Sequence, residues 1–315
     1  IWYGKTLSEK SLKAFPISNG MKKKIRIITH SGNFHADELL AVAALEIHLN
    51  GTPYEVIRTR DPEVIKTGDY IIDVGAVYDP ATNRFDHHQK GGAGERNGIP
   101  YSSFGLVWKH YGEAISGSKE VADGVEFRMV CPIDLADNGV EVYTPAFDGV
   151  HPYLLHGIVQ AMRPTWKEGE IHDVRFMELI PLMRRSIERE IITERDRLEG
   201  ARFVRDAYTH AGDKRIIVID GQYPWQEELA KYPEPLYIVK PRREVSSWQV
   251  ECVRNDVRSF KNRKSLPEAW RGLRDNKLAE ISGVSDAVFC HNTGYIAVAR
   301  SKEGALRLAQ LALGA

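Results

Sequence analysis

Short β-branched runs, each followed at once by polar residues, constrain the fold of the first half of this chain most strongly. A strand is predicted over Ile25–His30, and a helix over Asp37–His48, whose first turn carries the acidic residues that a helix dipole favours. Further strands are predicted over Glu55–Arg60 and Asp69–Gly75. Such alternation is typical of a parallel sheet, whose strands end along one edge. The polar residues that follow the strands should therefore lie together.

These polar residues are of the kinds that bind metal ions: His30, His35, Asp37, Asp73 and the tripeptide Asp86-His87-His88. Imidazole and carboxylate ligands without thiolates suit Mn²⁺, Mg²⁺, Fe²⁺, Co²⁺ and Zn²⁺, and the mixture of histidine and aspartate favours Mn²⁺ over Mg²⁺. Two such ions about 3.5 to 4 Å apart can hold a phosphoryl group for in-line attack. The pattern therefore predicts a dinuclear metal site and phosphoester hydrolysis.

Each of these residues has an alternative interpretation. His30 or His35 alone would more often be an ordinary polar residue, but their proximity to a third ligand type after one buried strand favours a metal site. Asp73 follows an apolar run, where a carboxylate needs a partner, although it could also begin a turn. His87 and His88 should point in different directions, so one is expected to bind metal and the other to contact phosphate or donate a proton.

Two further aspartates lie three positions apart in the segment CPIDLADNG, and either could complete the site. Asp134 and Asp137 should share one helix face or lie at a helix end, because Asn138-Gly139 is a helix-stop signal. Their spacing alone leaves a capping role and a metal-binding role equally open.

Composition excludes several classes of protein. Lys plus Arg and Asp plus Glu are balanced at 43 each, so no global positive charge indicates a nucleic-acid partner, and any such surface must be local. The 3 cysteines form no CxxC pair, which argues against a disulfide framework or a structural zinc site. No apolar run approaches the about 20 residues that span a bilayer, and no signal peptide is seen. A soluble cytoplasmic protein without a membrane partner is expected.

A chain of 315 residues is long enough for two domains. Residues 1–20 are interpreted as a tail or expression remnant, with Met21 as a natural start. Helices are predicted over 103–115 and 119–136, and strands over 215–220, 235–240, 248–253, 287–291 and 294–299, before a final helix. The predicted organisation is a parallel-sheet domain with helices on both faces over 21–175, a linker helix over 176–200 and a smaller α/β domain over 201–315.

The order of several motifs resembles a known family. The segments are THSGNFHADELLAVAAL, DYIIDVGAVYDPATNRFDHHQ, YSSFGLVWKHYG, IDLADNG, SFKNRKSLPEAWRGLRD and ISGVSDAVFCH. Together they resemble the DHH phosphoesterase superfamily, and most closely the exonuclease family named after melanocyte proliferating gene 1. The first superfamily motif usually has an aspartate where this chain has His35, a departure that this exonuclease family shares.

The resemblance implies how the metal ligands are divided. One ion would be held by His30, His35 and Asp73, and the other by Asp37, Asp73, His87 and Asp137, so that Asp73 bridges them. Asp137 is preferred to Asp134, which would support the ligands from behind. Asp86 would orient His87. His88 would contact phosphate or protonate the leaving oxygen.

The resemblance also implies an activity and a substrate. The expected protein is a Mn²⁺-dependent nuclease that removes nucleotides from a 3′ end, with single-stranded RNA as the suggested substrate and DNA as an alternative. The C-terminal domain would bind that strand through Arg263, Arg271, Arg274, His291 and Gly294. These belong to or follow a basic segment with Arg258, Lys261 and Lys264, beside Phe260 and Trp270 for base stacking; a solvated basic face is the alternative. Asn292 and Thr293 replace the small residues usual after the histidine.

Other functions remain open at this point. The same site could hydrolyse short oligonucleotides, cyclic dinucleotides or pyrophosphate. A protein that keeps the fold and binds nucleic acid without turnover is a candidate of another class, although all the expected ligands are present. A redox protein is disfavoured, because no thiolate accompanies the histidines. The oligomeric state is left open, with a homodimer as one alternative.

Overall fold

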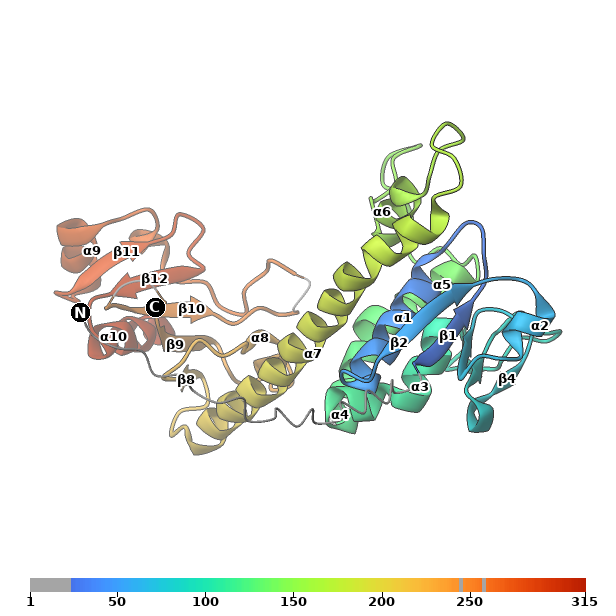
Figure 1. Cartoon of the computed structure of the whole chain (residues 1–315). Helices are drawn as coiled ribbons and strands as arrows, with labels where there is room; N and C mark the ends of the chain where they lie inside the picture. Colours follow the sequence, from blue (N-terminus) through green and yellow to red (C-terminus); the bar gives the residue numbers. More distant parts are fainter. Residues whose placement is uncertain (1–23, 244–245, 257–258) are drawn as a thin grey trace, which may run out of the picture. The chain divides into compact units, whose positions relative to one another are not determined.

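The computed structural model describes residues 24–243, 246–256 and 259–315 (Figure 1). The predictions for residues 1–20 and for Arg258 lie outside the described residues. The chain divides into two compact units. Unit 1 contains the described residues up to Ile115 together with Glu126–Ile187, and unit 2 contains Ser116–Val125 and Glu188–Ala315. Each unit has its own five-stranded sheet.

The sheet of unit 1 is built from five short strands of the first part of the chain. Its strands are β1 (Ile25–Thr29), β2 (Tyr54–Arg58), β3 (Tyr70–Ile72), β4 (Tyr78–Asp79) and β5 (Arg84–Phe85), in the order β2-β1-β3-β5-β4. The first four in this order are parallel, and β4 pairs antiparallel with β5. The sequence did not indicate β4 and β5, which are only 2 residues long each. Because β1, β3 and β5 are parallel neighbours, their carboxyl ends meet at one edge.

Helix α1 (Ala36–Leu49) is buried along most of its length. Its residues from Leu39 to Leu45 are all 0% exposed, so it fills the interior and does not present one apolar stripe. His35 is its N-cap residue, and the backbone N–H of His35 donates to the Glu38 carboxylate at 2.8 Å. This capping box fixes the start of α1 directly after the loop that follows β1.

The remaining elements of unit 1 surround this centre. They are α2 (Pro62–Ile65), the hairpin β6 (Glu95–Arg96) and β7 (Ile99–Pro100), α3 (Ser103–Ser116, whose last residue groups with unit 2), α5 (Cys131–Asp137), α6 (Leu155–Met162) and the first part of α7 (His172–His210). Both α5 and α6 contact α1.

The helix expected over 119–136 is present and consists of three consecutive parts. They are α4 (Lys119–Val125), a π-helical turn (Glu126–Val130) and α5. Pro132 lies in the first turn of α5 and has no backbone N–H to continue the α-helical hydrogen-bond ladder, which accounts for the π-helical turn. The predicted helical segment is therefore confirmed, with a π-helical turn inside it.

The charged segment is helical, as expected, but longer than 176–200. Helix α7 has 39 residues and contains Pro181. The boundary between the units, at Ile187 and Glu188, falls within it. Phe176 and Met183 of its first part are buried in unit 1, and Val204 of its second part packs in a core of unit 2 with Ile217.

The sheet of unit 2 is mainly antiparallel, as the sequence predicted. Its strands are β8 (Ile216–Val218), β9 (Tyr237–Pro241), β10 (Trp248–Cys252), β11 (Ala287–Cys290) and β12 (Ile296–Ala299), in the order β11-β12-β10-β9-β8. Among the described strands of this sheet, only β8 and β9 pair in parallel. The helices are α8 (Gln226–Leu229), α9 (Asp275–Ser282) and α10 (Lys302–Gly314). The predicted α/β class with a second α/β unit is confirmed.

Alternate residues of these strands serve two cores. Ile216, Tyr237 and Val250 pack with Leu308 of α10, whereas Ile217 and Ile238 pack in the other cluster. This period of two is the expected pattern for a sheet covered on both faces. Within the described part of the chain, no helix is long and apolar enough to cross a membrane.

Candidate metal site

Three neighbouring strand ends bring histidine and aspartate side chains together. His30 follows β1, Asp73 follows β3 and Asp86-His87-His88 follows β5. Asp73 lies between the histidines: its Oδ2 is 3.2 Å from His30 Nε2, and its Oδ1 is 3.4 Å from His87 Nε2. The backbone of Asp73 is left-handed, with φ 54°, an uncommon conformation for a residue other than glycine. Such strain is often found at functional sites.

The amino end of α1 adds a further group. Asp37 is 1% exposed, and Glu38 is fully buried with its Oε1 at 3.1 Å from His30 Nε2. Glu38 was not among the predicted site residues. Its only signal in the sequence was the acidic first turn, which we had explained by the helix dipole. Its burial beside a histidine adds it to the candidate ligands.

Helix α5 places its two aspartates differently. Asp137 Oδ2 lies 3.1 Å from His87 Nε2. Asp134 is fully buried and accepts hydrogen bonds from Arg96 Nη2 at 2.6 Å and from Ser102 Oγ at 2.5 Å. Asp134 therefore joins α5 to other elements of unit 1, whereas Asp137 lies with the histidines.

Ligand atoms close enough to share an ion form three overlapping groups in the described residues: His30, His35, Glu38 and Asp73; Asp73, His87 and His88; and His35, Asp37 and Asp137. Asp73 and His35 each belong to two of them. The predicted metal residues are thus all brought together by the fold, and these groups can bind metal ions.

Asp37 is a buried carboxyl group that a bound cation would stabilise. Both of its carboxylate oxygens are buried and have no hydrogen-bond partner among the described residues. Burial raises the pKa of Asp37 well above its usual range, and the nearby charges of Asp73 and Asp137 raise it further. A buried carboxylate without a partner is costly. A divalent cation would remove this cost, so the residues present fit a metal ion.

Neighbouring carboxylates raise the pKa of the two central histidines, His30 and His87. Burial lowers the pKa of His30, but its contacts with Asp73 and Glu38 outweigh this and raise the pKa to about 10. For His87, burial is likewise outweighed by Asp137 and Asp73, and the pKa rises to about 10. Burial alone would raise the pKa of Asp73, but the two histidines hold it far below its usual range.

Asp86 contacts a different histidine from the one expected. Its Oδ1 accepts from the backbone N–H of His88 at 3.0 Å and lies 2.8 Å from His88 Nδ1, while its Oδ2 accepts from Ala76 N–H. The described hydrogen bonds of Asp86 therefore orient His88, and none joins it to the ring of His87. The His88 side chain is 61% exposed.

A cavity of about 240 Å³ opens onto these side chains. Three residues of its wall come from α6 and its end: His156, Val159 and Arg163. Arg163 Nε donates to the carbonyl of Phe34 at 2.7 Å and so braces the loop that carries His35. This face of α6 was not predicted from the sequence, although the spacing of its residues is helical.

The residues predicted to bind substrate all lie in unit 2, but only some of them are free to contact a ligand. Arg263 donates to the backbone carbonyls of Tyr232 and Pro235, so its guanidinium has a structural role. Arg274 is exposed, with its guanidinium carbon 4.6 Å from the Phe289 ring centre. Trp270 is only 5% exposed and belongs to the core, so it cannot stack on a base, whereas Phe260 is 88% exposed.

Arg271, His291 and Gly294 are brought close together. A Cβ atom on Gly294 would lie 2.7 Å from Arg271 Nε, and the backbone N–H of Gly294 donates to the His291 carbonyl. Gly294 has φ 69°, which favours glycine. This turn therefore needs glycine both for its conformation and for the approach of Arg271.

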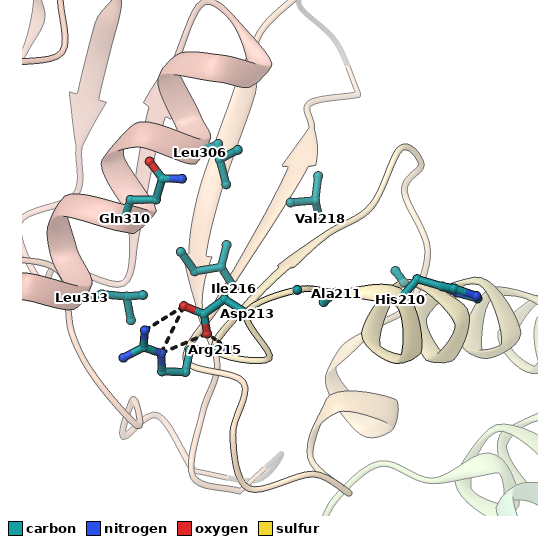
Figure 2. Close-up of a pocket in the computed structure, with 11 residues that line it drawn as sticks. His210, Ala211, Asp213, Arg215, Ile216, Val218, Leu306, Gln310 and Leu313 are labelled. Carbon is teal, nitrogen blue, oxygen red and sulfur yellow. Dashed lines mark hydrogen bonds and ion pairs between the residues drawn. The ribbon is translucent and has the colours of Figure 1, made fainter.

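Another cavity, of about 660 Å³, lies in unit 2 (Figure 2). Its wall combines the end of α7, strand β8 and helix α10, and includes an ion pair between Asp213 and Arg215 at 2.7 Å. It is larger than the cavity beside Asp73, but none of the described metal-type groups lines it. The chemistry therefore points to the smaller cavity as the candidate site.

Fold and site define an α/β protein of two units whose parallel sheet carries groups that can bind metal ions. Residues 26–313 match the model of the MYG1 exonuclease family, which is described as an uncharacterised protein family, UPF0160. The chain belongs to this family.

Curated relatives cover most of the chain. It is 30% identical to the MYG1 exonuclease of Homo sapiens, over 91% of this chain and 85% of that protein. It is 31% identical to a MYG1 protein of Schizosaccharomyces pombe, over 93% of this chain and 98% of that protein. The MYG1 exonuclease of Bos taurus is 32% identical, over 91% of this chain and 84% of that protein.

Proposed function

We propose that this protein is a metal-dependent phosphodiesterase of the DHH type that removes nucleotides from the 3′ end of single-stranded RNA. The observation that carries the proposal is the buried, unpartnered carboxylate of Asp37 beside Asp73 and the histidines. The names of the relatives, which call several of them exonucleases, support nuclease chemistry.

Two divalent cations, with Mn²⁺ favoured, would occupy the overlapping groups. His30, His35 and Asp73 would hold one, with Glu38 as a further ligand. The other would be held by Asp37, Asp73, His87 and Asp137. When bound, such ions activate a water molecule and offset negative charge on the phosphoryl oxygens.

The protein's own side chains would position the reactants. Ser103 Oγ donates to Asp73 Oδ1 at 3.0 Å, which helps to fix the carboxylate shared by the groups. Asp86 holds Nδ1 of His88, so that Nε2 of this exposed ring is available to contact a phosphate oxygen or to protonate the leaving oxygen.

Substrate binding by unit 2 is part of the proposal. The exposed Arg271 and Arg274 would contact phosphates, with His291 and Gly294 forming the turn beside Arg271. Arg263 is less suited to this role, because it is only partly exposed and its guanidinium donates to three backbone carbonyl groups, whereas in the described hydrogen bonds the exposed Arg271 donates only to that of Leu266, at 3.4 Å.

The test compares three substrates: single-stranded RNA labelled at its 5′ end, DNA of matched sequence and pyrophosphate. Each is incubated with Mn²⁺ or with a chelator, using the full chain and the variants Asp73→Ala and His87→Ala. His210→Ala, an exposed histidine in unit 2, is the matched control. Stepwise shortening of RNA that requires Mn²⁺ would support the proposal if Asp73→Ala and His87→Ala both abolish it and His210→Ala does not.

Other outcomes would replace it. Phosphate release from pyrophosphate without RNA shortening would indicate a small-molecule hydrolase. Shortening that starts from the 5′ end, followed with a 3′ label, would contradict the proposed direction. Binding of RNA without turnover of any substrate would favour a silent nucleic-acid-binding protein.

A further inference from the structure

A second cavity in unit 1 adjoins the candidate metal site. It measures about 310 Å³ and lies between the segment after α5 and the start of α6. Ala136 and His156 line both this cavity and the one beside Asp73. Ala136 directly precedes Asp137 on α5, so the second cavity begins next to a candidate metal ligand.

The wall of this second cavity is aromatic and apolar. Tyr143 and Tyr153 line it with Val140, Val142 and Leu154. Tyr153 is 73% exposed, and Val140 and Val142 are about half exposed. Aromatic and aliphatic side chains left open beside a polar metal site suit a flat apolar group of the same substrate.

Tyr153 is held as a stacking platform. Its hydroxyl donates to the carbonyl of Gly157 at 3.2 Å. A Cβ atom on Gly157 would lie 3.0 Å from the Tyr153 ring, so glycine lets this ring lie against α6. Tyr143 is tied in turn to His151, with 3.1 Å between its hydroxyl and Nδ1.

The charge of this second cavity disfavours a phosphate as its occupant. Glu141 is exposed and lines it, and Lys and Arg are absent from its described lining. The first cavity is lined by Asp37, Asp73 and Asp137 as well as Arg163, so a phosphate would bind there together with the metal ions of the proposed function. The second cavity has no such group of ligands among its described residues and suits a neutral part of the substrate.

We propose that this second cavity, lined by Tyr143 and Tyr153, is a nucleobase subsite. It would bind the base of the terminal nucleotide while the phosphate of that nucleotide lies at the metal site. This inference rests on the proposed function and adds a specificity element supplied by unit 1. Stacking on tyrosine accepts any base, so the subsite should favour a base over none without selecting a sequence.

The test uses two RNA substrates that differ only in whether the terminal nucleotide carries a base or is abasic. The full chain should cleave the base-bearing end with a kcat/KM about ten-fold higher, which corresponds to about 1.4 kcal/mol. In Tyr153→Ala this ratio should fall toward one, while Tyr153→Phe, which keeps the ring, should preserve it. Phe147→Ala removes an exposed aromatic residue outside the lining of this cavity and should leave the ratio unchanged.

A binding measurement separates failure of the subsite from failure of the proposed function. Calorimetry should show adenosine 5′-monophosphate binding about ten-fold more tightly than ribose 5-phosphate, and Tyr153→Ala should remove this preference. This result would support the subsite even if no RNA were cleaved. Cleavage of both RNAs at equal rates by the full chain would overturn the subsite and leave the nuclease proposal standing.

Two further outcomes would also overturn it. Tyr153→Ala lowering kcat/KM equally for both RNAs would show a merely structural role. The other outcome is a full chain that shows no base preference and forms a homodimer by light scattering. If Tyr153→Ala dissociates this dimer, a second copy of the chain covers this surface.

Discussion

Individual carboxylates of this protein have separable tasks, and the two aspartates of α5 show this best. We predict that Asp134→Asn destabilises the fold by about 3 kcal/mol, because it removes the charge paired with Arg96 in a buried setting. Asp137→Asn should destabilise the metal-free protein less, because the lost contact with His87 is partly offset by weaker repulsion of Asp37, and it should weaken Mn²⁺ binding. Urea unfolding and metal titration of both variants would check this. Equal loss of stability in the two would contradict the separation.

Protons and metal ions should compete for the central residues. The pKa of His30 and that of His87 are both raised to about 10, so both rings are protonated at neutral pH without metal. Histidine binds metal in its neutral form. Metal binding at pH 7 should therefore release protons, and the apparent affinity should rise as pH increases toward 10.

This competition is measured by calorimetry in buffers with different heats of ionisation. His210→Ala should release as many protons as the unaltered chain. A Mn²⁺ affinity that is constant from about pH 6 to about pH 9 would contradict the prediction.

Close helix packing depends on particular glycines. A Cβ atom on Gly124 of α4 would lie 2.1 Å from the carboxylate of Glu194, a buried residue of α7. We predict that Gly124→Ala destabilises the protein by about 1 to 3 kcal/mol, because the buried Glu194 carboxylate, which pairs with Arg197, must be displaced or the helices must shift. Gly212→Ala is the control, since a Cβ there meets no atom within 4 Å. Thermal unfolding of both variants tests the prediction. Equal melting temperatures for Gly124→Ala and Gly212→Ala would contradict the close contact between Gly124 and Glu194.

The sequence was informative about elements wherever a local pattern was strong. The β-branched run of β1 and the acidic start of α1 were recognised, and the strands of unit 2 were expected close to their observed positions. The paired strands β4 and β5 were missed because 2 residues carry too little periodicity. The helix over 119–136 was predicted, but its π-helical turn was not, because the effect of Pro132 was not considered.

Only part of the candidate site could be predicted from the sequence, because some of its residues join it through tertiary packing alone. His30, Asp73 and His87 follow strands, so their convergence follows from parallel pairing. Glu38 and Arg163 belong to the site through burial and tertiary packing, which no local spacing encodes. Similarly, Trp270 looked available for stacking until its burial in the core of unit 2 was known.

For the molecule as a whole, the account requires that unit 1 supplies the metal centre and one wall for the substrate. Unit 2 adds exposed basic residues, among them Arg271 and Arg274. The balanced charge of the chain makes such local surfaces necessary for binding a polyanion.

The central claim is that Asp73 joins two metal positions in unit 1. The number of Mn²⁺ ions bound per chain, measured by equilibrium dialysis with elemental analysis, tests it most directly. The account predicts two ions for the full chain and for His210→Ala, and fewer than two for Asp73→Ala. No bound Mn²⁺ in the full chain, or an unchanged count after the Asp73→Ala substitution, would contradict it.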